Sequence, residues 1–357
     1  MTFVILLAGG SGERFWPKSR MTRPKQFLAV GGKETLLAQS LRRLSQYPRR
    51  HIRIVAPQEQ IVLFKKCGLL PKDLFLWEPL PRNTAAAVAL AANELARLES
   101  EATLVILPCD AWVRDTKRFL ATLKQAEELA KVFDGIVLIG AHPTYPATGF
   151  GYIGHARRGE RRGKVKAYRV ERFVEKPALR TAQRLLREGS VLWNAGIFVA
   201  RIPVLLEAFR VHMPLLDRGF RRAAKAKNPA ERKKALSEFY RTLPSISFDH
   251  GILEHMKSLL VVPGRFGWQD LGSWRSLEQM APAGRGGNLL FGDAYAAEGK
   301  ENIFVSEAGH LLAGIGVSGL IVVHTSDATL LCPKERAEDV KRLVRSLKTK
   351  KAFSRYL

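Results

Sequence analysis

The start of the chain constrains the fold most, because an apolar run opens directly into a glycine-rich turn. Residues 3–8 read Phe-Val-Ile-Leu-Leu-Ala, and Gly9, Gly10 and Gly12 follow before a cluster of cations that ends at Lys25. A buried strand followed by glycines presents bare backbone amides to a phosphate. The pattern therefore predicts an α/β sheet with a nucleotide site at the carboxyl end of its first strand.

Two better-known glycine motifs do not fit this turn. The dinucleotide fingerprint G-x-G-x-x-G fails because Phe15 stands at the third glycine position, and the P-loop fails because Arg14 stands at its second glycine. A tight turn with solvated basic residues is the alternative interpretation. The position of the turn, directly after the first strand, favours the phosphate site.

Length and composition predict one large domain and a smaller one. The chain has 357 residues, of which 46% are hydrophobic, and we expect a catalytic domain over 1–282 and a small β-rich domain over 283–357. No apolar segment approaches the ~20 residues that cross a bilayer, so we expect no membrane association and a cytoplasmic location. The cysteines Cys67, Cys109 and Cys332 are widely spaced, which favours neither disulfides nor a metal knuckle. Cys109 is interpreted as a buried thiol rather than a nucleophile.

The net charge of +25 raises the alternative of a polyanion-binding protein. The excess cations gather at 157–162, 218–234 and 341–355, on a hairpin tip and on helical patterns where solvated charge is ordinary. No aromatic RNA-binding signature or zinc finger accompanies them. We therefore expect no specific nucleic-acid partner.

Apolar runs and helical patterns alternate in the first part of the chain. Runs at 51–56, 74–77, 103–107 and 135–141 are separated by helical patterns at 35–46, 58–67, 84–99 and 116–132. This alternation predicts a doubly wound, mostly parallel sheet. The alanine-rich helix begins at Asn83 or Thr84, and its free amides are a second candidate contact for a nucleotide.

The remaining chain predicts a mixed region and then an all-β appendage. We expect strands at 151–155, 166–175, 193–200 and 259–262, with helices at 179–187, 203–209, 217–243 and 251–256. After residue 282, short strand-like pieces recur at regular steps, which is typical of a β-helix, and a helix over 335–347 closes the chain. The appendage either packs on the catalytic domain or forms a homodimer contact.

Two acids and a polar trio are candidate site residues. Asp110 ends an apolar strand, and Asp270 stands alone in a loop of tryptophans and glycine. Two carboxylates that meet beside phosphates are the usual ligands of Mg²⁺, although each could equally be a turn or cap residue. Glu175, Lys176 and Asn194 follow or enter strands, and together they would suit a sugar phosphate.

Taken together, these motifs resemble those of a known family, the mannose-1-phosphate guanylyltransferases among the sugar-1-phosphate nucleotidyltransferases. The resemblance covers essentially the whole chain and is carried by the segments 7–17, 24–27, 82–85, 173–177, 193–196 and 268–274. It implies a Rossmann-like nucleotidyltransferase fold with a β-helix-like appendage. It also implies that GMP passes from GTP to mannose 1-phosphate. One departure is Ala111, because the family commonly has His after the metal-binding Asp.

The resemblance also implies roles for individual residues. The nucleotide would be contacted by Ala8, Gly9, Gly10, Gly12, Asn83 and Thr84. Arg14 and Lys25 would hold the leaving pyrophosphate, and Asp110 and Asp270 would bind Mg²⁺. The sugar phosphate would be contacted by Gly149, Glu175, Lys176 and Asn194. Another sugar 1-phosphate, another nucleoside triphosphate, or a non-catalytic sugar-nucleotide-binding regulator remain the alternatives.

Overall fold

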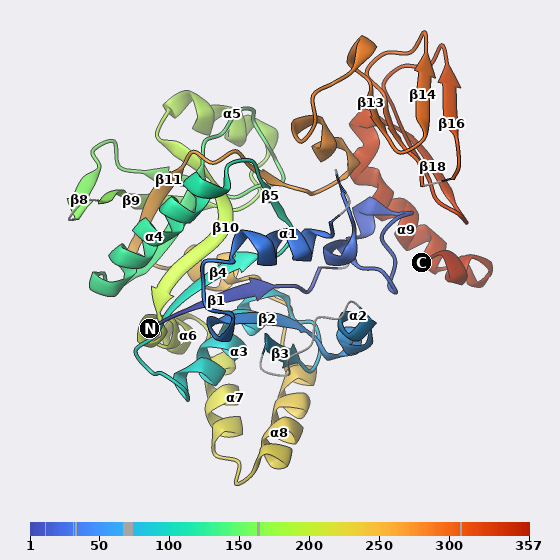
Figure 1. Cartoon of the computed structure of the whole chain (residues 1–357). Coiled ribbons are helices and arrows are strands. Elements are labelled where there is room, and N and C mark those ends of the chain that lie inside the picture. The colour runs from blue at the N-terminus through green and yellow to red at the C-terminus, as the bar shows by residue number, and fades with distance from the viewer. Residues whose placement is uncertain (11, 31, 33, 67–73, 163–164, 308) are drawn as a thin grey trace. The chain divides into compact units, whose positions relative to one another are not determined.

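Two compact units make up the chain, and each is built from separate stretches of sequence. A computed structural model describes residues 1–10, 12–30, 32, 34–66, 74–162, 165–307 and 309–357 (Figure 1). The first unit comprises residues 1–9, 44–108 and 113–268, and the second comprises 10–43, 109–112 and 269–357. The boundary that we predict between residues 282 and 283 stays a prediction.

The first unit is organised around a ten-stranded sheet. The apolar run at the chain start forms β1, whose residues Val4, Ile5 and Leu6 are fully buried between β2 and β4. The strand order is β3-β2-β1-β4-β10-β6-β11-β9-β7, with β8 paired to β9. Its strands are β1 (Thr2–Leu7), β2 (Ile52–Pro57), β3 (Phe75–Glu78), β4 (Thr103–Pro108), β6 (Ile136–Ala141), β7 (Tyr152–His155), β8 (Glu160–Arg162), β9 (Val165–Val174), β10 (Val191–Arg201) and β11 (Leu259–Gly264).

The predicted α/β class is confirmed, but the sheet is mixed rather than mostly parallel. Strands β1 to β4 run parallel, as does β6 with β11, whereas β10 is antiparallel to β4, β6 and β7. Apolar runs indicate burial but not direction, since direction is decided by the connection that leads into each strand. The antiparallel β10 thus divides the sheet into two halves.

Helices pack on this sheet through small and apolar side chains. The alanine-rich α3 (Asn83–Ala96) buries most of its residues in a core shared with β1, β4 and β10. Around it lie α6 (Ile202–His212), α7 (Pro214–Ala224) and α8 (Pro229–Thr242), and Figure 1 shows the last two as a hairpin. The other helices are α2 (Ile61–Lys66), α4 (Thr116–Val132) and α5 (Leu179–Glu188).

Three predicted helices differ from the structure. The single helix expected at 217–243 is two helices, because Asn228 caps α8 and Pro229 stands at its first position. The helix expected at 251–256 is a π-helical turn, η6 (Asp249–Leu253). The helix expected at 335–347 is divided into a 3₁₀ helix, η9 (Lys334–Asp339), and α9 (Val340–Lys348), whereas α3 begins at Asn83 as predicted.

The second unit contains the predicted β-helix-like appendage. Strands β13 (Leu289–Phe291), β15 (Ile303–Val305) and β17 (Leu320–His324) stack in parallel, and β14 (Ala294–Ala297) stacks on β16 (Leu312–Ile315). The antiparallel β18 (Thr329–Pro333) completes the larger sheet. Inside the coil, Asn302 Nδ2 donates to Asn288 Oδ1 at 2.9 Å, so two buried amides link successive turns. β5 (Ala111–Val113) and β12 (Trp268–Asp270) lie where the chain passes between the units.

The glycine turn shares a core with the C-terminal segment. Phe15 and Trp16 are buried against Trp274 and the strands of the appendage. The indole Nε1 of Trp16 donates to the carbonyl of Tyr356 at 2.8 Å. An ion pair of 2.6 Å joins Glu13, in the short helix η1 (Glu13–Phe15), to Lys348 at the end of α9 (Val340–Lys348). The second unit is therefore one packed body that includes the turn, the 3₁₀ helix η9 (Lys334–Asp339) and α9.

Candidate active site

The glycine turn leaves β1 with one glycine that no other residue could replace. Gly12 has φ +68°, and a Cβ added there would lie 2.5 Å from Cβ of Lys25. An L side chain would be strained and would also collide. At Gly10, no described atom lies within 4 Å of the corresponding position. Gly12 therefore lets the backbone of the turn pack directly on Lys25.

Lys25 joins the two acids that the sequence singles out. Its Nζ lies 2.7 Å from Asp110 Oδ2 and 3.6 Å from Asp270 Oδ1. Lys25 is 8% exposed and begins the short helix η2 (Lys25–Phe27). All three residues belong to the second unit. The structure brings Lys25, Asp110 and Asp270 together.

Neighbouring elements hold both acids in place. The hydroxyl of Ser40, in α1 (Leu36–Arg43), donates to the carbonyl of Cys109 at 2.8 Å, and the Arg43 guanidinium donates to the carbonyl of Ala111. These bonds hold the backbone of the two residues that flank Asp110. Asp270 precedes Trp274, which is buried and whose Nε1 donates to the carbonyl of Trp16 at 3.0 Å.

The charge of Lys25 is stabilised where it lies. Burial lowers the pKa of the Lys25 ammonium, but the carboxylates of Asp110 and Asp270 outweigh burial and hold that pKa above its ordinary value. The ammonium also shows that one cation can contact both carboxylates at once. Two carboxylates fit Mg²⁺, which takes its remaining ligands from water and phosphate. No group of three or more metal-ligating side chains gathers among the described residues.

Arg14 is engaged in an ion pair of its own. Its Nε lies 2.6 Å from Glu338 Oε2, at an angle that does not make a hydrogen bond. The Arg14 side chain is 42% exposed, so the pair is open to solvent. A phosphate that binds Arg14 would compete with Glu338 for the charge of the guanidinium.

A second cluster, in the first unit, unites the predicted sugar-phosphate residues. Glu175 Oε1 lies 2.5 Å from Lys176 Nζ, and the Glu175 side chain is 7% exposed. A Cβ at Gly151 would lie 2.5 Å from Glu175 Oε2 and 3.2 Å from Cβ of Asn194. Lys176 has φ +45°, a conformation that non-glycine residues rarely adopt. Glu175, Lys176 and Asn194 therefore form one tightly packed group, and Gly149 lies two residues before Gly151 in an exposed loop.

Sequence reasoning missed one member of this second cluster, Asp249. Its Oδ1 accepts from Asn194 Nδ2 at 2.7 Å. Burial, assisted by the charge of Glu175, raises the pKa of Asp249 to about 6. The only signal was an isolated acid directly after the apolar Phe248, and pairing with a residue 55 positions away cannot be inferred from that.

The other nucleotide candidates lie in the first unit. Ala8 is buried, and its backbone N–H donates to the carbonyl of Val55 at 2.8 Å. A Cβ at Gly9 would make only ordinary contact with Pro57. Asn83 has φ +65° and its Oδ1 accepts from the backbone of Thr84, whose hydroxyl in turn accepts from the backbone of Phe248. The start of α3 is thereby tied to the segment that carries Asp249.

The cysteines give no nucleophile among the described residues. Cys109 is buried, and burial raises the pKa of its thiol, which disfavours the reactive thiolate. Cys332 is half-buried, and burial raises its pKa too. Cys67 lies outside the described residues, as does Ser11 of the glycine turn. The interpretation of Cys109 as a buried thiol is consistent with these observations.

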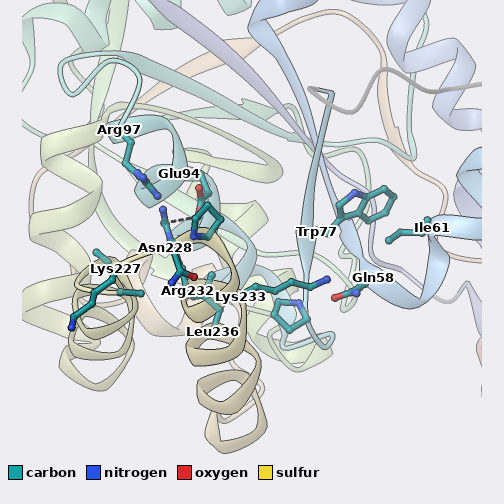
Figure 2. Close-up of a pocket in the computed structure, with 14 residues that line it drawn as sticks. Gln58, Ile61, Trp77, Glu94, Arg97, Lys227, Asn228, Arg232, Lys233 and Leu236 are labelled. Carbon is teal, nitrogen blue, oxygen red and sulfur yellow. Dashed lines mark hydrogen bonds and ion pairs between the residues drawn. The ribbon is translucent and has the colours of Figure 1, made fainter.

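A cavity of about 520 Å³ opens elsewhere in the first unit (Figure 2). Trp77 and Ile61 line one end, and Glu94 and Arg232 line the other, where their side chains form an ion pair of 2.5 Å. None of the predicted site residues lines it. Within the described chain, no helix combines the length and apolarity needed to span a bilayer.

Comparison with protein families covers nearly the whole chain. Residues 3–284 match the family model described as nucleotidyl transferase, and residues 298–347 match one described as mannoseP isomerase/GMP-like beta-helix domain. Both matches follow the division between sheet and β-helix seen in the fold.

Named relatives extend over the same length. The chain is 35% identical over 361 residues to mannose-1-phosphate guanylyltransferase RfbM of Salmonella typhimurium, covering 98% of this chain and 73% of the relative. It is 33% identical over 354 residues to mannose-1-phosphate guanylyltransferase of Escherichia coli, covering 97% of this chain and 73% of the relative. A crystal structure titled mannose-1-phosphate geranyltransferase, from Thermus thermophilus, superposes with a TM-score of 0.87 at 34% identity, covering 97% of this chain and 99% of that one.

Proposed function

We propose, from the premise that this chain belongs to the nucleotidyl transferase family, that it transfers GMP from GTP to mannose 1-phosphate, giving GDP-mannose and pyrophosphate. A phosphate oxygen of mannose 1-phosphate forms a bond to the α-phosphorus of GTP. The bond from that phosphorus to the oxygen bridging to the β-phosphate breaks, and its electron pair leaves with pyrophosphate. Reaction in line requires the two anions to be held together.

One observation carries the proposal, the Lys25 ammonium held by Asp110 and Asp270 against Gly12. The phosphate nucleophile is an anion at neutral pH, so the reaction needs alignment and charge neutralisation rather than a general base. A permanently charged ammonium beside a glycine turn suits that task. A catalytic thiol is not required, in keeping with the buried Cys109.

We assign the metal site to Asp110 and Asp270. When bound there, Mg²⁺ neutralises charge on the phosphates. Lys25, which contacts both carboxylates, would bind phosphate oxygens, and Arg14 would hold the departing pyrophosphate. Both cations act on charge that grows as the α–β bond breaks.

We assign the remaining substrate contacts to the first unit. Ala8, Gly9 and the residues Asn83 and Thr84 at the start of α3 would contact the nucleoside, with Gly10 and Gly12 of the second unit along the phosphates. Glu175 would accept from sugar hydroxyls, and Lys176, which is 60% exposed, would bind the sugar phosphate. Asn194 would donate from its amide, and Gly149 would let the sugar approach the backbone. A cytoplasmic location and a homodimer contact stay predictions.

Product identification tests the proposal most directly. Incubating the chain with GTP, mannose 1-phosphate and Mg²⁺ should give GDP-mannose and pyrophosphate in equal amounts. A matched reaction without the sugar phosphate should release no pyrophosphate. Substituting the other nucleoside triphosphates and other hexose 1-phosphates then measures base and sugar choice. Failure to form any sugar nucleotide would overturn the assignment.

A further inference from the structure

Asp249 is a half-buried acid that the proposed reaction does not use. It begins the π-helical turn η6 (Asp249–Leu253), directly after the fully buried Phe248. π-helical turns are rare and occur frequently at functional sites. The Oδ1 of Asp249 accepts from Asn194 Nδ2 at 2.7 Å, which brings η6 to the cluster of Glu175, Lys176 and Asn194.

The amide of Asn194 is constrained on both of its ends. Its Oδ1 accepts from the backbone N–H of Gly196 at 3.0 Å, and Gly196 has φ +68° within an irregularity of the β10–β6 register. Its Nδ2 donates to Asp249. Rotating the amide by half a turn would set Oδ1 against a carboxylate and Nδ2 against an N–H. An ionised Asp249 therefore permits one amide orientation only.

Few groups surround the Asp249 carboxyl, and they oppose one another. Burial raises its pKa, and so does Glu175, which directly follows β9, while the backbone N–H of Asp249, the amide of Asn194 and Lys176 lower it. On its own turn, His250 Nδ1 lies 3.1 Å from Glu254 Oε2, so these two groups interact with each other. The ionised state of Asp249 thus depends first on burial and the charge of Glu175, which disfavour it, and then on hydrogen bonds and Lys176, which favour it.

We propose that Asp249 is a positioning residue of the sugar-phosphate site, whose ionised carboxylate fixes the Asn194 amide so that its second N–H points to an acceptor oxygen of the sugar. This inference rests on the proposed function, since Asn194 must contact the sugar. Asp249 itself touches no substrate atom. Its effect passes through the orientation of one amide.

Three variants separate this role from a purely structural one. Asp249→Ala removes the acceptor and should raise KM for mannose 1-phosphate about tenfold, with KM for GTP unchanged. Asp249→Asn can present either an oxygen or an N–H to Asn194, as a protonated Asp249 can, so it permits both amide orientations and should restore only part of the lost affinity for the sugar phosphate. Glu254→Gln, on the same turn, is the matched control and should behave as the wild type. Thermal unfolding of each variant shows that it is folded.

The pH dependence gives the readout that a structural role would not move. As pH falls through about 6, Asp249 takes up a proton, and KM for mannose 1-phosphate of the wild type should rise. The substrate phosphate titrates in a similar range, so the wild type must be compared with Asp249→Asn. The difference between the two profiles isolates Asp249: it should be largest above pH 7.5 or so, where Asp249 is ionised, and should shrink as pH falls and Asp249 takes up its proton.

The outcomes separate this inference from the proposed function. A wild type that makes no GDP-mannose would overturn both. A wild type that makes it, with an unchanged KM for mannose 1-phosphate in Asp249→Ala, would overturn the positioning role alone. Equal increases of both KM values together with lost thermal stability, or identical pH profiles of the wild type and Asp249→Asn, would also overturn it.

Discussion

The clusters around Lys25 and around Asp249 surround a titratable group with opposite electrostatic environments. Lys25 is surrounded by two carboxylates, which favour its charged form. Asp249 is held by a neutral amide and lies near another carboxylate, which disfavours its charged form. Both pKa values are raised. The raised pKa keeps the Lys25 ammonium charged, whereas it makes the Asp249 carboxyl easier to protonate. A raised pKa favours the charged form of a base but the neutral form of an acid.

The difference predicts which cluster responds to pH. The Lys25 cluster keeps its ammonium throughout the physiological range, as an anion-binding group should. The Asp249 cluster changes charge near pH 6, so its geometry depends on the solution. Four variants test this difference between the two clusters and related groups.

Asp110→Asn should have the largest effect, because it removes one of the two negative charges that surround Lys25. Lys25 would keep only Asp270, at 3.6 Å, and one of the two proposed metal ligands would lose its charge. Turnover should fall at least about a hundredfold, or ~3 kcal/mol in the barrier, in a folded protein. Asp339→Asn, an exposed acid of the same unit, is the control. Near-normal turnover of Asp110→Asn would remove Asp110 from the mechanism.

Glu78→Gln extends the contrast to a buried carboxyl whose Oε1 finds no hydrogen-bond partner among the described residues. Burial raises the pKa of Glu78 to about 8, above its unfolded value. Its contribution to stability is therefore full below about pH 4.5 and is lost as pH rises toward 8. Unfolding of the wild type should lose about 3 kcal/mol between pH 4.5 and 7 through this group, and the variant should lack that slope. Parallel stability profiles would contradict the assignment.

Gly12→Ala tests whether backbone packing sets the position of Lys25. The added Cβ meets Lys25 at 2.5 Å and forces an unfavourable φ, so stability should fall by about 1–2 kcal/mol and turnover should fall with it. Gly32→Ala, in the same unit but outside the proposed site, is the matched control, because its methyl group has no described neighbour within 4 Å. Equal behaviour of the two variants in thermal unfolding and turnover would show that the close approach is unimportant.

Glu338→Gln should have the smallest effect, because the pair it breaks is open to solvent. Releasing Arg14 should lower the apparent Kd for pyrophosphate by no more than about fivefold, since exposed ion pairs contribute ~1 kcal/mol or less. Calorimetric titration with pyrophosphate and Mg²⁺ measures the change. Weaker binding by Glu338→Gln would mean that Glu338 orients Arg14 instead of competing for it.

The sequence predicts the Lys25 cluster better than the Asp249 cluster for a physical reason. Asp110 follows a strand beside the one that carries the glycine turn, so strand order alone brings them to one edge. Asp249 meets Asn194 through a π-helical turn and a register irregularity, which have no local signature here. Asn228 and Pro229 have the chemistry of a helix start, but the continuous helical periodicity of 217–243 predicts one helix there.

The interleaving of the second unit has a consequence for biosynthesis. Residues 10–43 leave the ribosome early, yet they pack with residues 269–357, and Trp16 reaches the carbonyl of Tyr356. Translation at about 5–20 residues per second means that the nascent turn waits tens of seconds for its partner segment. During that interval Phe15 and Trp16 have only neighbours such as Leu28 and Leu36 to pack against and lack Trp274 and the strands of the appendage, so this stretch stays more exposed to water than in the folded chain.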